Sequence, residues 1–246
     1  MKRRDAIFAV LVIVVIWQVA AMAVNRPILP TPIVVINIFW KELFNGLPVH
    51  FLTSLWRVTA GMLLSVATAA PVGLVIGGSR RLNRLLSPII YLLYPVPKVV
   101  FVPIVFLILG IGDLAKITII FLILFFQIVV LVRDQAAGLA SQLLQSLRSL
   151  GAGRRALFRF VYLPASLPAI LTGLRQSVGI AVAVLYIAES TATRKGLGYY
   201  IVYNGSTLLD YPAMYAGVLA MSLLGLGLYF AVDWLERKIC QWKYVT

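Results

Sequence analysis

The chain has 246 residues, of which 61% are hydrophobic and only 12% are charged, and its mean hydropathy is +0.97. These values exclude an ordinary soluble globular domain and indicate a membrane protein. The net charge of +14 does not indicate a nucleic-acid partner, because the basic residues are divided among short segments between apolar runs. Membrane topology and anionic lipid headgroups explain them better. The single cysteine, Cys240, excludes an intrachain disulfide and a cysteine-based metal site.

Six apolar runs, each close to the roughly 20 residues that cross a hydrocarbon core as a helix, follow one another along the chain. They are Ile7–Val24, Val58–Gly78, Pro88–Leu109, Leu114–Val132, Ala165–Ala188 and Ala213–Val232. We therefore expect an all-α membrane protein with about six transmembrane helices. Small residues within the runs, among them Gly61, Gly73 and Gly173, predict close packing between helices.

The first run follows Lys2, Arg3 and Arg4 and ends near Ala21-Met22-Ala23, which is also typical of a cleaved secretory signal. We interpret it as an uncleaved helix, because it is about 18 residues long and further spans follow it. With the N-terminus in the cytoplasm, 14 of the 22 basic residues lie in cytoplasmic segments and six in outer ones. The count places Arg133 in the first set, and Arg57 and Lys116 in the second. The sequence thus predicts a multi-pass protein with both termini in the cytoplasm.

Prolines mark two segments. Pro95, Pro97 and Pro103 place three prolines within nine residues of the third run, so we expect that span to be kinked or broken. Such a break either borders a water-filled solute path or is a packed kink away from any solute. Between the first two runs, Pro32 precedes a mixed run, Ile33–Phe44, that predicts a short surface helix.

The segment Leu147–Pro164 carries four arginines and no acidic residue. Its apolar residues recur at helical spacing, while Arg148, Arg155 and Arg159 share another side, so the segment is amphipathic. We expect Gly151 to lie in the turn between two short helices, and Pro164 to close the second helix at the membrane. By its charge pattern alone, the segment could also be an ordinary cytoplasmic loop that rests on lipid headgroups.

The order of residues here is Gln145-Ser146-Leu147, three residues, Gly151, nine residues, Val161, one residue and Leu163-Pro164. This order resembles the EAA loop of ATP-binding-cassette (ABC) importer permeases, in which G, I and LP follow EAA at the same spacings. Gly151, Leu163 and Pro164 match, Val161 is a conservative replacement, and Gln145-Ser146-Leu147 stands where the family has EAA. The likeness continues over about 51–236, through Thr172–Arg175 and Lys195–Tyr200 among others, and points to the nitrate/sulfonate/taurine branch.

The resemblance implies a type I ABC importer permease (MetI-like) fold. It implies an N-terminal transmembrane helix with an outer loop at 1–50, and a permease core of five transmembrane helices at 51–246. The EAA-like loop at about 134–165 would hold a cytoplasmic coupling helix that contacts the ATPase subunits. The implied coupling residues are Gln145, Ser146, Leu147, Arg148, Gly151, Val161, Leu163 and Pro164.

The resemblance also implies partners and a location. These are two cytoplasmic ABC ATPase subunits, a second permease chain in a homodimer, an extracytoplasmic solute-binding protein, and the bacterial cytoplasmic (inner) membrane. The solute it implies is a small anion such as a sulfonate, taurine or nitrate. A different small solute, such as a pyrimidine vitamin precursor, is the alternative.

Three charged residues within the spans are candidates for the solute path, namely Lys98, Arg175 and Glu189. Each has a structural alternative, because Lys98 could snorkel to the cytoplasmic interface, and Arg175 and Glu189 could form structural pairs.

Motifs for catalysis and for bound cofactors are missing from the sequence. The only histidine, His50, has no carboxylate or cysteine at ligand spacing, so we expect no metal site. The sequence has no phosphate-binding loop, so ATP hydrolysis must belong to another chain. We expect a transport subunit without a cofactor rather than an enzyme. A carrier driven by an ion gradient is the runner-up, although it would usually need several carboxylates within the membrane.

Overall fold

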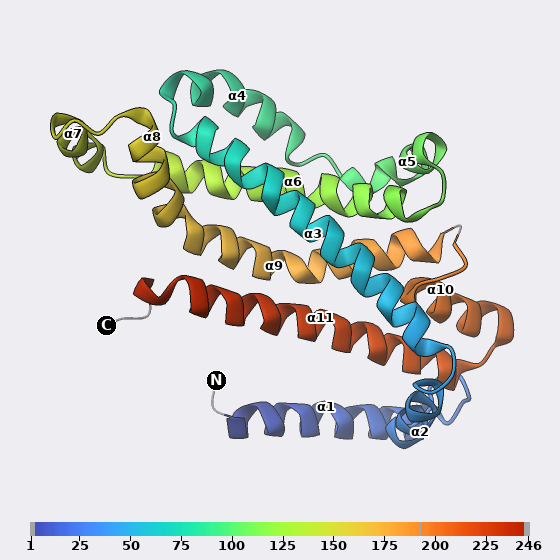
Figure 1. Ribbon diagram of the computed structural model, residues 1–246. Coiled ribbons are helices and arrows are strands. Elements are labelled where there is room, and N and C mark those ends of the chain that lie inside the picture. The colour runs from blue at the N-terminus through green and yellow to red at the C-terminus, as the bar shows by residue number, and fades with distance from the viewer. Residues whose placement is uncertain (1–2, 192, 244–246) are drawn as a thin grey trace. The chain divides into compact units, whose positions relative to one another are not determined.

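The computed structural model describes residues 3–191 and 193–243, and these residues form helices and no strand (Figure 1). The α-helices are α1 (Arg3–Val24), α2 (Pro32–Glu42), α3 (Leu47–Gly77), α4 (Arg80–Leu93), α5 (Val102–Leu109), α6 (Asp113–Ala137), α7 (Ser141–Ser149), α8 (Arg154–Leu157), α9 (Leu163–Ser190), α10 (Leu197–Val202) and α11 (Tyr211–Ile239). The 3-10 helices are η1 (Lys98–Phe101) and η4 (Gln241–Lys243), and the π-helical segments are η2 (Phe158–Tyr162) and η3 (Tyr203–Leu208). The predicted all-α class is confirmed.

Five helical segments of the described chain are long and apolar enough to cross a membrane. They are Ile7–Val24, Leu47–Gly77, Asp113–Ala137, Arg154–Ser190 and Tyr211–Ile239. A sixth span results if Arg80–Leu93 and Lys98–Leu109 are counted as one bent span. Each predicted apolar run overlaps one of these spans.

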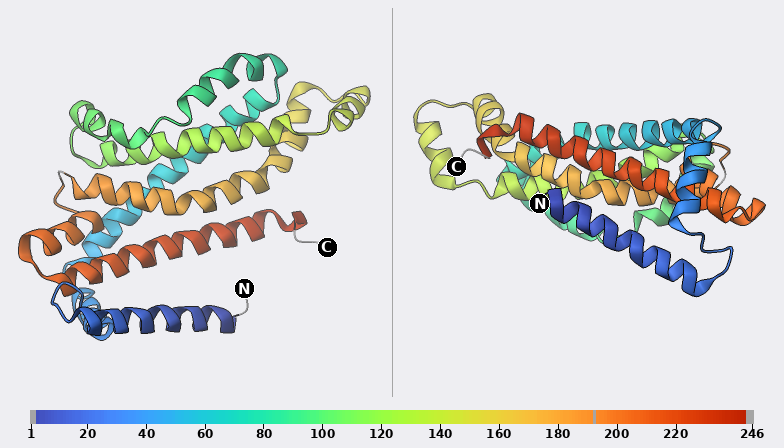
Figure 2. Two further views of the ribbon diagram at one scale, coloured as in Figure 1. Left: turned by 180° about the vertical axis from the view of Figure 1, so that it is seen from behind. Right: turned by 90° about the horizontal axis from the view of Figure 1, so that it is seen from below.

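The third span is bent by 76° between α4 and the helical segment that η1 begins, and the left view of Figure 2 shows the break. The break predicted from the prolines is therefore confirmed. The helix ends at Leu93 because Pro95 and Pro97 have no N–H to donate to the preceding turn. Pro103 instead lies in the first turn of α5, where a helix needs no donor, so it begins a helix.

The chain forms two compact units, and α3, α9 and α11 each run through both. The first unit comprises Met1–Leu55 and Glu189–Leu224, and the second comprises Trp56–Ala188 and Gly225–Thr246. In the first unit, the indole N–H of Trp17 donates to the carbonyl of Pro30 at 3.1 Å, and its ring stacks on Tyr215 with centroids 5.9 Å apart. The predicted surface helix is α2, with Pro32 at its start.

Close packing between α3 and α6 organises the second unit. A Cβ added at Gly61 would lie 2.7 Å from Cγ2 of Ile120, and one at Gly73 would lie 2.8 Å from Cβ of Val132. Side chains at these positions would force the two helices apart, so the predicted role of the small residues is confirmed here.

Three of the basic residues used in the charge count are buried on helices. Arg57 on α3 pairs with Asp113 at 2.6 Å, and Lys116 on α6 donates to the carbonyl of Ile111 at 2.5 Å. Arg133, also on α6, donates to Tyr91 Oη at 2.8 Å and to Asp134 at 2.5 Å. Partners within the second unit offset the cost of burying these charges, so the three residues belong to packed helices rather than to exposed segments.

Pro164 does not close a helix, contrary to expectation. The chain stays helical from Arg154 to Ser190, and Pro164 lies in the first turn of α9. Immediately before it, the turn is π-helical, and the N–H of Leu163 donates to the carbonyl of Phe158. This wider turn shifts the hydrogen-bond pattern just where proline supplies no donor, so the helix continues.

Candidate functional site

The coupling segment, which we define as Ser141–Pro164, begins with α7, an exposed helix at one end of the second unit (Figures 1 and 2). Leu143, Leu147 and Leu150 follow one another at spacings of four and three residues, which places them on one side. Leu143 is 48% exposed and Leu150 is 83% exposed. An apolar stripe left exposed on a short helix is typical of a surface that docks onto a partner.

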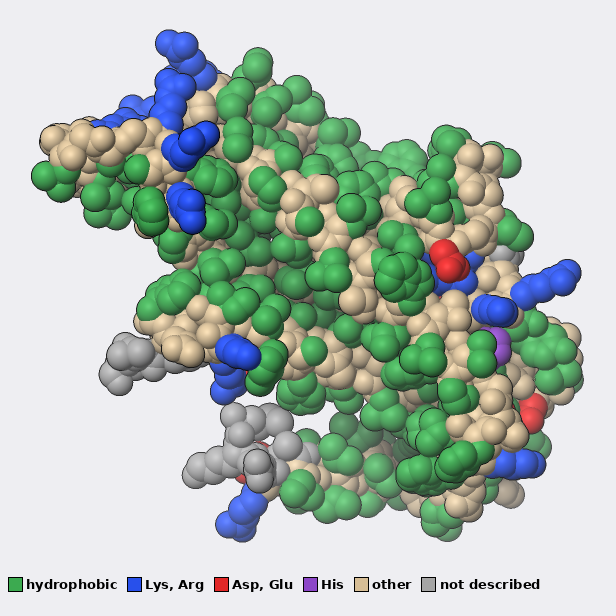
Figure 3. Space-filling model, in the orientation of Figure 1, with side chains coloured by type: hydrophobic (Ala, Val, Ile, Leu, Met, Phe, Trp, Pro, Cys, Tyr) green, Lys and Arg blue, Asp and Glu red, His purple; other side chains and the backbone are tan. Residues whose placement is uncertain are grey.

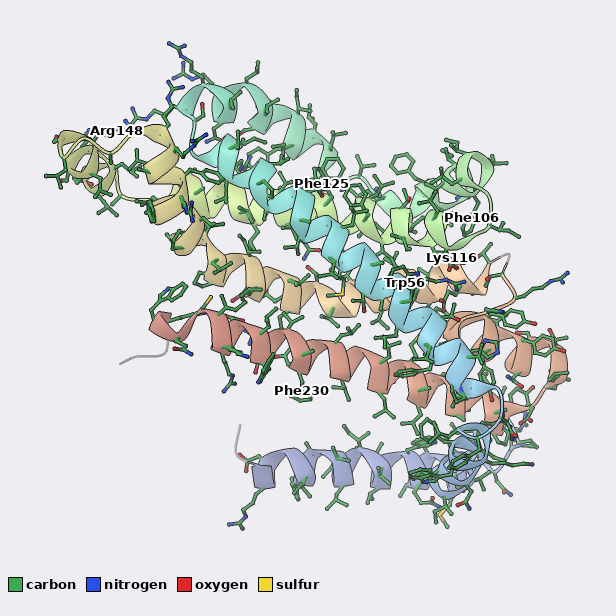
Figure 4. All side chains as sticks on the ribbon, viewed as in Figure 1. Trp56, Phe106, Lys116, Phe125, Arg148 and Phe230 are labelled. Atoms are coloured by element: carbon green, nitrogen blue, oxygen red, sulfur yellow. The ribbon has the colours of Figure 1, made fainter. Side chains whose placement is uncertain are left out.

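Gly151 lies in the turn after α7, as predicted, and has a φ of +86°. The other residues of the segment divide into two groups. Gln145 to Arg148 lie on α7, and Figure 4 shows Arg148 at this protruding end. Val161 lies in η2, while Leu163 and Pro164 begin α9. The structure thus places the first group on the exposed helix and the second group where the segment joins a membrane span.

Exposed arginines lie on the coupling segment and at the start of α4. Arg80, Arg81, Arg84, Arg148, Arg154, Arg155 and Arg159 are all exposed. In Figure 3, the blue side chains gather over the end of the second unit that holds the start of α4 together with α7 and α8. Such a surface attracts acidic groups on a partner or on lipid headgroups.

An open cavity of about 360 Å³ lies on the second unit, and several of its lining residues, such as Tyr94 and Ile180, are exposed. Its polar lining residues are Tyr94, Lys98 and Gln127, from the break after α4 and from α6. The apolar lining residues are Val96, Pro97, Val99, Ile123, Ile180 and Val184. An apolar cavity with a few convergent polar groups is the usual form of a small-molecule site.

Lys98 is the only charged residue that lines this cavity. Its Nζ donates to the carbonyl of Leu93 at 2.9 Å and to that of Tyr94 at 2.6 Å. These carbonyls belong to the end of α4, where the chain offers few backbone donors because Pro95 and Pro97 follow. The ammonium therefore caps the carboxyl end of α4, where a positive charge is also favoured by the helix dipole.

Arg175 occupies a different environment, between α9 and α11. Its guanidinium pairs with Asp233 and lies 3.5 Å from Oε2 of Glu236. Glu236 Oε1 accepts hydrogen bonds from Thr172 and Lys243, each at 2.8 Å. Arg175 is not among the residues that line the cavity of Lys98, and it forms the structural ion pair that we considered for it.

Glu189 lies in the first unit and is fully buried. Its Oε2 accepts hydrogen bonds from Ser54 Oγ at 2.7 Å and from the N–H of Gly198 at 3.0 Å. Ser54 Oγ in turn accepts from the N–H of Leu197 at 2.8 Å. Together these bonds cap the start of α10. A Cβ at Gly196 would collide with the carboxylate, so this tight turn requires glycine.

Side chains beside α10 also form hydrogen bonds and ring contacts. His50 Nδ1 lies 3.1 Å from the backbone nitrogen of Gly196, and the imidazole stacks on Tyr199. Tyr200 donates its hydroxyl to Glu42 at 3.2 Å. Burial, reinforced by this carboxylate, raises the pKa of Tyr200, so the hydroxyl stays protonated and remains a donor. Within residues 3–191 and 193–243, no three His, Cys, Asp or Glu side chains are grouped to hold a metal ion.

Gln127 is a cavity residue that the sequence reasoning missed. It is the only amide side chain in the apolar run Leu114–Val132, and an isolated amide at that depth is a signal for function in a membrane span. The signal could identify the residue but could not show that it shares a cavity with Lys98.

Comparison with known proteins gives three similarities. The family described as "Binding-protein-dependent transport system inner membrane component" matches residues 69–241. A Bacillus subtilis protein named as an aliphatic sulfonates transport permease, SsuC, is 31% identical over 235 residues, which cover 94% of this chain and 85% of the relative. The formylaminopyrimidine transport permease protein ThiX of Halalkalibacterium halodurans is 29% identical over 238 residues, which cover 95% of this chain and 93% of the relative.

The fold is shared with a solved structure. The inward-facing MetNI methionine ABC transporter has a chain that aligns with a TM-score of 0.68 and 20% sequence identity. The alignment covers 80% of this chain and 98% of the other.

Proposed function

Because the chain belongs to the family of binding-protein-dependent inner membrane transport components, the permeases of ABC importers, we propose that it carries a small anion past the cavity at Lys98. The chain is a membrane transport subunit with the type I importer permease fold, and ATP hydrolysis belongs to a separate subunit. The observation that carries the proposal is the position of Lys98, whose ammonium is the only charge lining the cavity.

The proposed solute is a sulfonate, taurine or nitrate. Lys98 is the single charge in a cavity whose lining is mostly apolar, and its positive charge favours an anion by direct attraction. The similarity to a permease named for aliphatic sulfonates supports the same class. In this proposal Lys98 contacts the solute, whereas Arg175 and Glu189 position the helices around the path.

We further propose that the coupling segment contacts the ATPase through Gln145, Ser146, Leu147, Arg148 and Gly151, while Val161, Leu163 and Pro164 join it to α9. The exposed Leu143 of α7, Leu150 just after this helix and the arginines nearby support this role, because an apolar centre with a charged rim is typical of a docking surface. The resulting orientation places both termini in the cytoplasm. The exposed basic residues around α7 and at the start of α4 support that side.

The proposed assembly contains two copies of this chain, two ATPase subunits and an extracytoplasmic binding protein. Residues 1–50 form an added helix and outer loop, and 51–246 form the permease core. The family match at 69–241 lies entirely within that core and supports this division.

A pyrimidine precursor is the second candidate solute. It is favoured by the similarity to a formylaminopyrimidine permease, and the amide of Gln127 could bind a neutral heterocycle. The two candidates differ in charge, so they differ in their dependence on Lys98.

Uptake by the reconstituted complex tests the proposal. The permease, its ATPase and its binding protein would be placed in liposomes, and uptake of sulfonates, taurine, nitrate and formylaminopyrimidine would be compared. We expect anion uptake that Lys98→Met abolishes and Lys98→Arg largely keeps. Lys238→Met, which removes an exposed lysine of α11, is the control. Uptake restricted to the neutral solute would contradict the proposal, as would full anion uptake by Lys98→Met.

A further inference from the structure

Gln127 places a polar side chain in the middle of a membrane span. It lies on α6, well inside the limits Asp113 and Ala137, and its side chain is half-buried in the wall of the cavity. Among the described residues it makes no side-chain hydrogen bond. Because the amide is half-buried and makes no bond to the protein, its donors and acceptor are available to water or to a solute that fills the cavity.

The ammonium of Lys98, which lines the same cavity, is held by backbone carbonyls. An ammonium has three N–H donors, and the carbonyls of Leu93 and Tyr94 accept two of them. The third donor makes no hydrogen bond among the described residues, and the rings of Phe126 and Tyr94 lie 5.0 Å and 5.6 Å from Nζ. Two carbonyl bonds and two ring contacts therefore restrict the ammonium before a ligand binds.

Apart from Tyr94, the remaining lining is apolar, and the whole lining lacks any acidic residue. Val99, Ile123, Ile180 and Val184 can accommodate a hydrocarbon tail, whose transfer from water is favourable. A solute ammonium would find no carboxylate here and would lie close to Lys98. A bare inorganic anion would leave the apolar wall without a contact.

We propose that Gln127 and Lys98 together bind the oxyanion head of the solute, and that the cavity selects a monoanion with a short hydrocarbon tail and no ammonium group. This inference rests on the proposed function, namely that the solute is an anion. The amide N–H₂ of Gln127 supplies one hydrogen bond and the ammonium of Lys98 another, and two fixed donors suit a sulfonate or carboxylate head.

The experiment measures solute moved per ATP hydrolysed in liposomes that hold the complete complex with loaded binding protein. The probes are labelled butanesulfonate, taurine and nitrate. Gln127→Met keeps the side-chain length and removes the amide, and Gln127→Glu places a negative charge beside the head. Gln135→Met, at an exposed position of the same helix, is the matched control.

With butanesulfonate, we expect Gln127→Met to lower uptake per ATP at least about tenfold, the usual effect of losing one hydrogen bond to a charged group. ATPase stimulation by the binding protein should persist in this variant. Gln127→Glu should lower the solute moved per ATP further, and Gln135→Met should leave this quantity unchanged. In the unaltered protein, butanesulfonate should give a higher ratio than taurine or nitrate.

The outcomes separate the two proposals. If the unaltered complex moves none of the anions, the proposed function fails. If it moves butanesulfonate but Gln127→Met keeps the full ratio, only the inference about Gln127 fails. A parallel loss of uptake and ATPase stimulation in both Gln127 variants would indicate a merely structural role and overturn the inference. A preference for taurine or nitrate would overturn the inferred selection of a monoanion with a hydrocarbon tail and no ammonium group.

Discussion

The backbone N–H of Gly151 donates to the carbonyl of Arg148 at 2.9 Å, just where α7 ends. One residue later, the N–H of Ala152 donates to the carbonyl of Leu147 at 3.0 Å. This pair of bonds, with Gly151 at a φ of +86°, is a Schellman motif. The direction in which α7 leaves the rest of the coupling segment is therefore set by a backbone conformation that glycine adopts readily and other residues rarely do.

The first prediction concerns this turn. Gly151→Ala should destabilise the turn by about 1 kcal/mol through φ alone, because nothing lies within 4 Å of the added Cβ. Gly151→Asp should add a negative charge among the arginines of the coupling segment. We expect both variants to reach the membrane and to lose ATP-driven uptake, with the larger loss in Gly151→Asp.

Gly153 provides the matched controls. It lies two residues away with a φ of −72°, and a Cβ there would also meet nothing within 4 Å. Gly153→Ala should leave uptake unchanged, and Gly153→Asp reports the effect of charge without backbone strain. Membrane abundance, ATPase pull-down and uptake are measured in the same cells. Normal uptake by Gly151→Asp at normal abundance would contradict the coupling role.

The second prediction concerns the buried hydroxyl of Ser54. Ser54→Ala leaves the N–H of Leu197 without its acceptor and removes one donor to Glu189. A buried polar group that loses its partner costs about 1–3 kcal/mol, so the variant should melt at a clearly lower temperature. Thr53→Ala is the control, because that exposed hydroxyl bonds only to the carbonyl of Val49. Equal melting temperatures for the two purified variants would rule out a stabilising role for the Ser54 contacts.

Features with a local cause could be predicted from the sequence. Pro95 and Pro97 remove backbone donors from adjacent turns, so a break follows whatever packs around it. Gly151 is similar, since a glycine after an amphipathic run commonly ends a helix. The apolar runs are also local, because the length of a span is set by the thickness of the membrane.

Features that depend on distant partners could not be predicted. Arg133 pairs with the adjacent Asp134, but its partners Ser87 and Tyr91 lie 46 and 42 residues earlier in the chain, so its burial could not be predicted locally. Gln127 carried a local signal, but the cavity that it shares with Lys98 exists only once α6 packs beside the break after α4. The end of a helix at Pro164 was predicted wrongly because a π-helical turn, which has no clear sequence signature, precedes this proline.

The third prediction compares two arginines that share one carboxylate. Arg175 and Arg237 both pair with Asp233, but the side chain of Arg175 is 22% exposed and that of Arg237 is 68% exposed. Arg175→Gln should lower the free energy of unfolding by about 1.5–3 kcal/mol, because it also leaves the buried Glu236 with less positive charge nearby. Arg237→Gln removes an exposed pair within one helix and should cost no more than about 0.5 kcal/mol. Thermal melting of the two purified variants measures the difference, and equal losses would show that burial of the pair is unimportant.

The last prediction concerns the side of the membrane on which each loop lies. Cys240 is fully buried, and this burial raises the pKa of its thiol, so little reactive thiolate forms at neutral pH. The unaltered chain should therefore resist a membrane-impermeant maleimide in right-side-out vesicles.

Phe44 and Leu150 are each 83% exposed, and the proposed orientation places them on opposite sides of the membrane. The Phe44→Cys variant should be labelled in intact vesicles, whereas the Leu150→Cys variant should be labelled only after the vesicles are permeabilised. Because the two positions are equally exposed, differences in labelling report sidedness rather than burial. The reverse pattern would place both termini outside and would remove the coupling segment from the reach of a cytoplasmic ATPase.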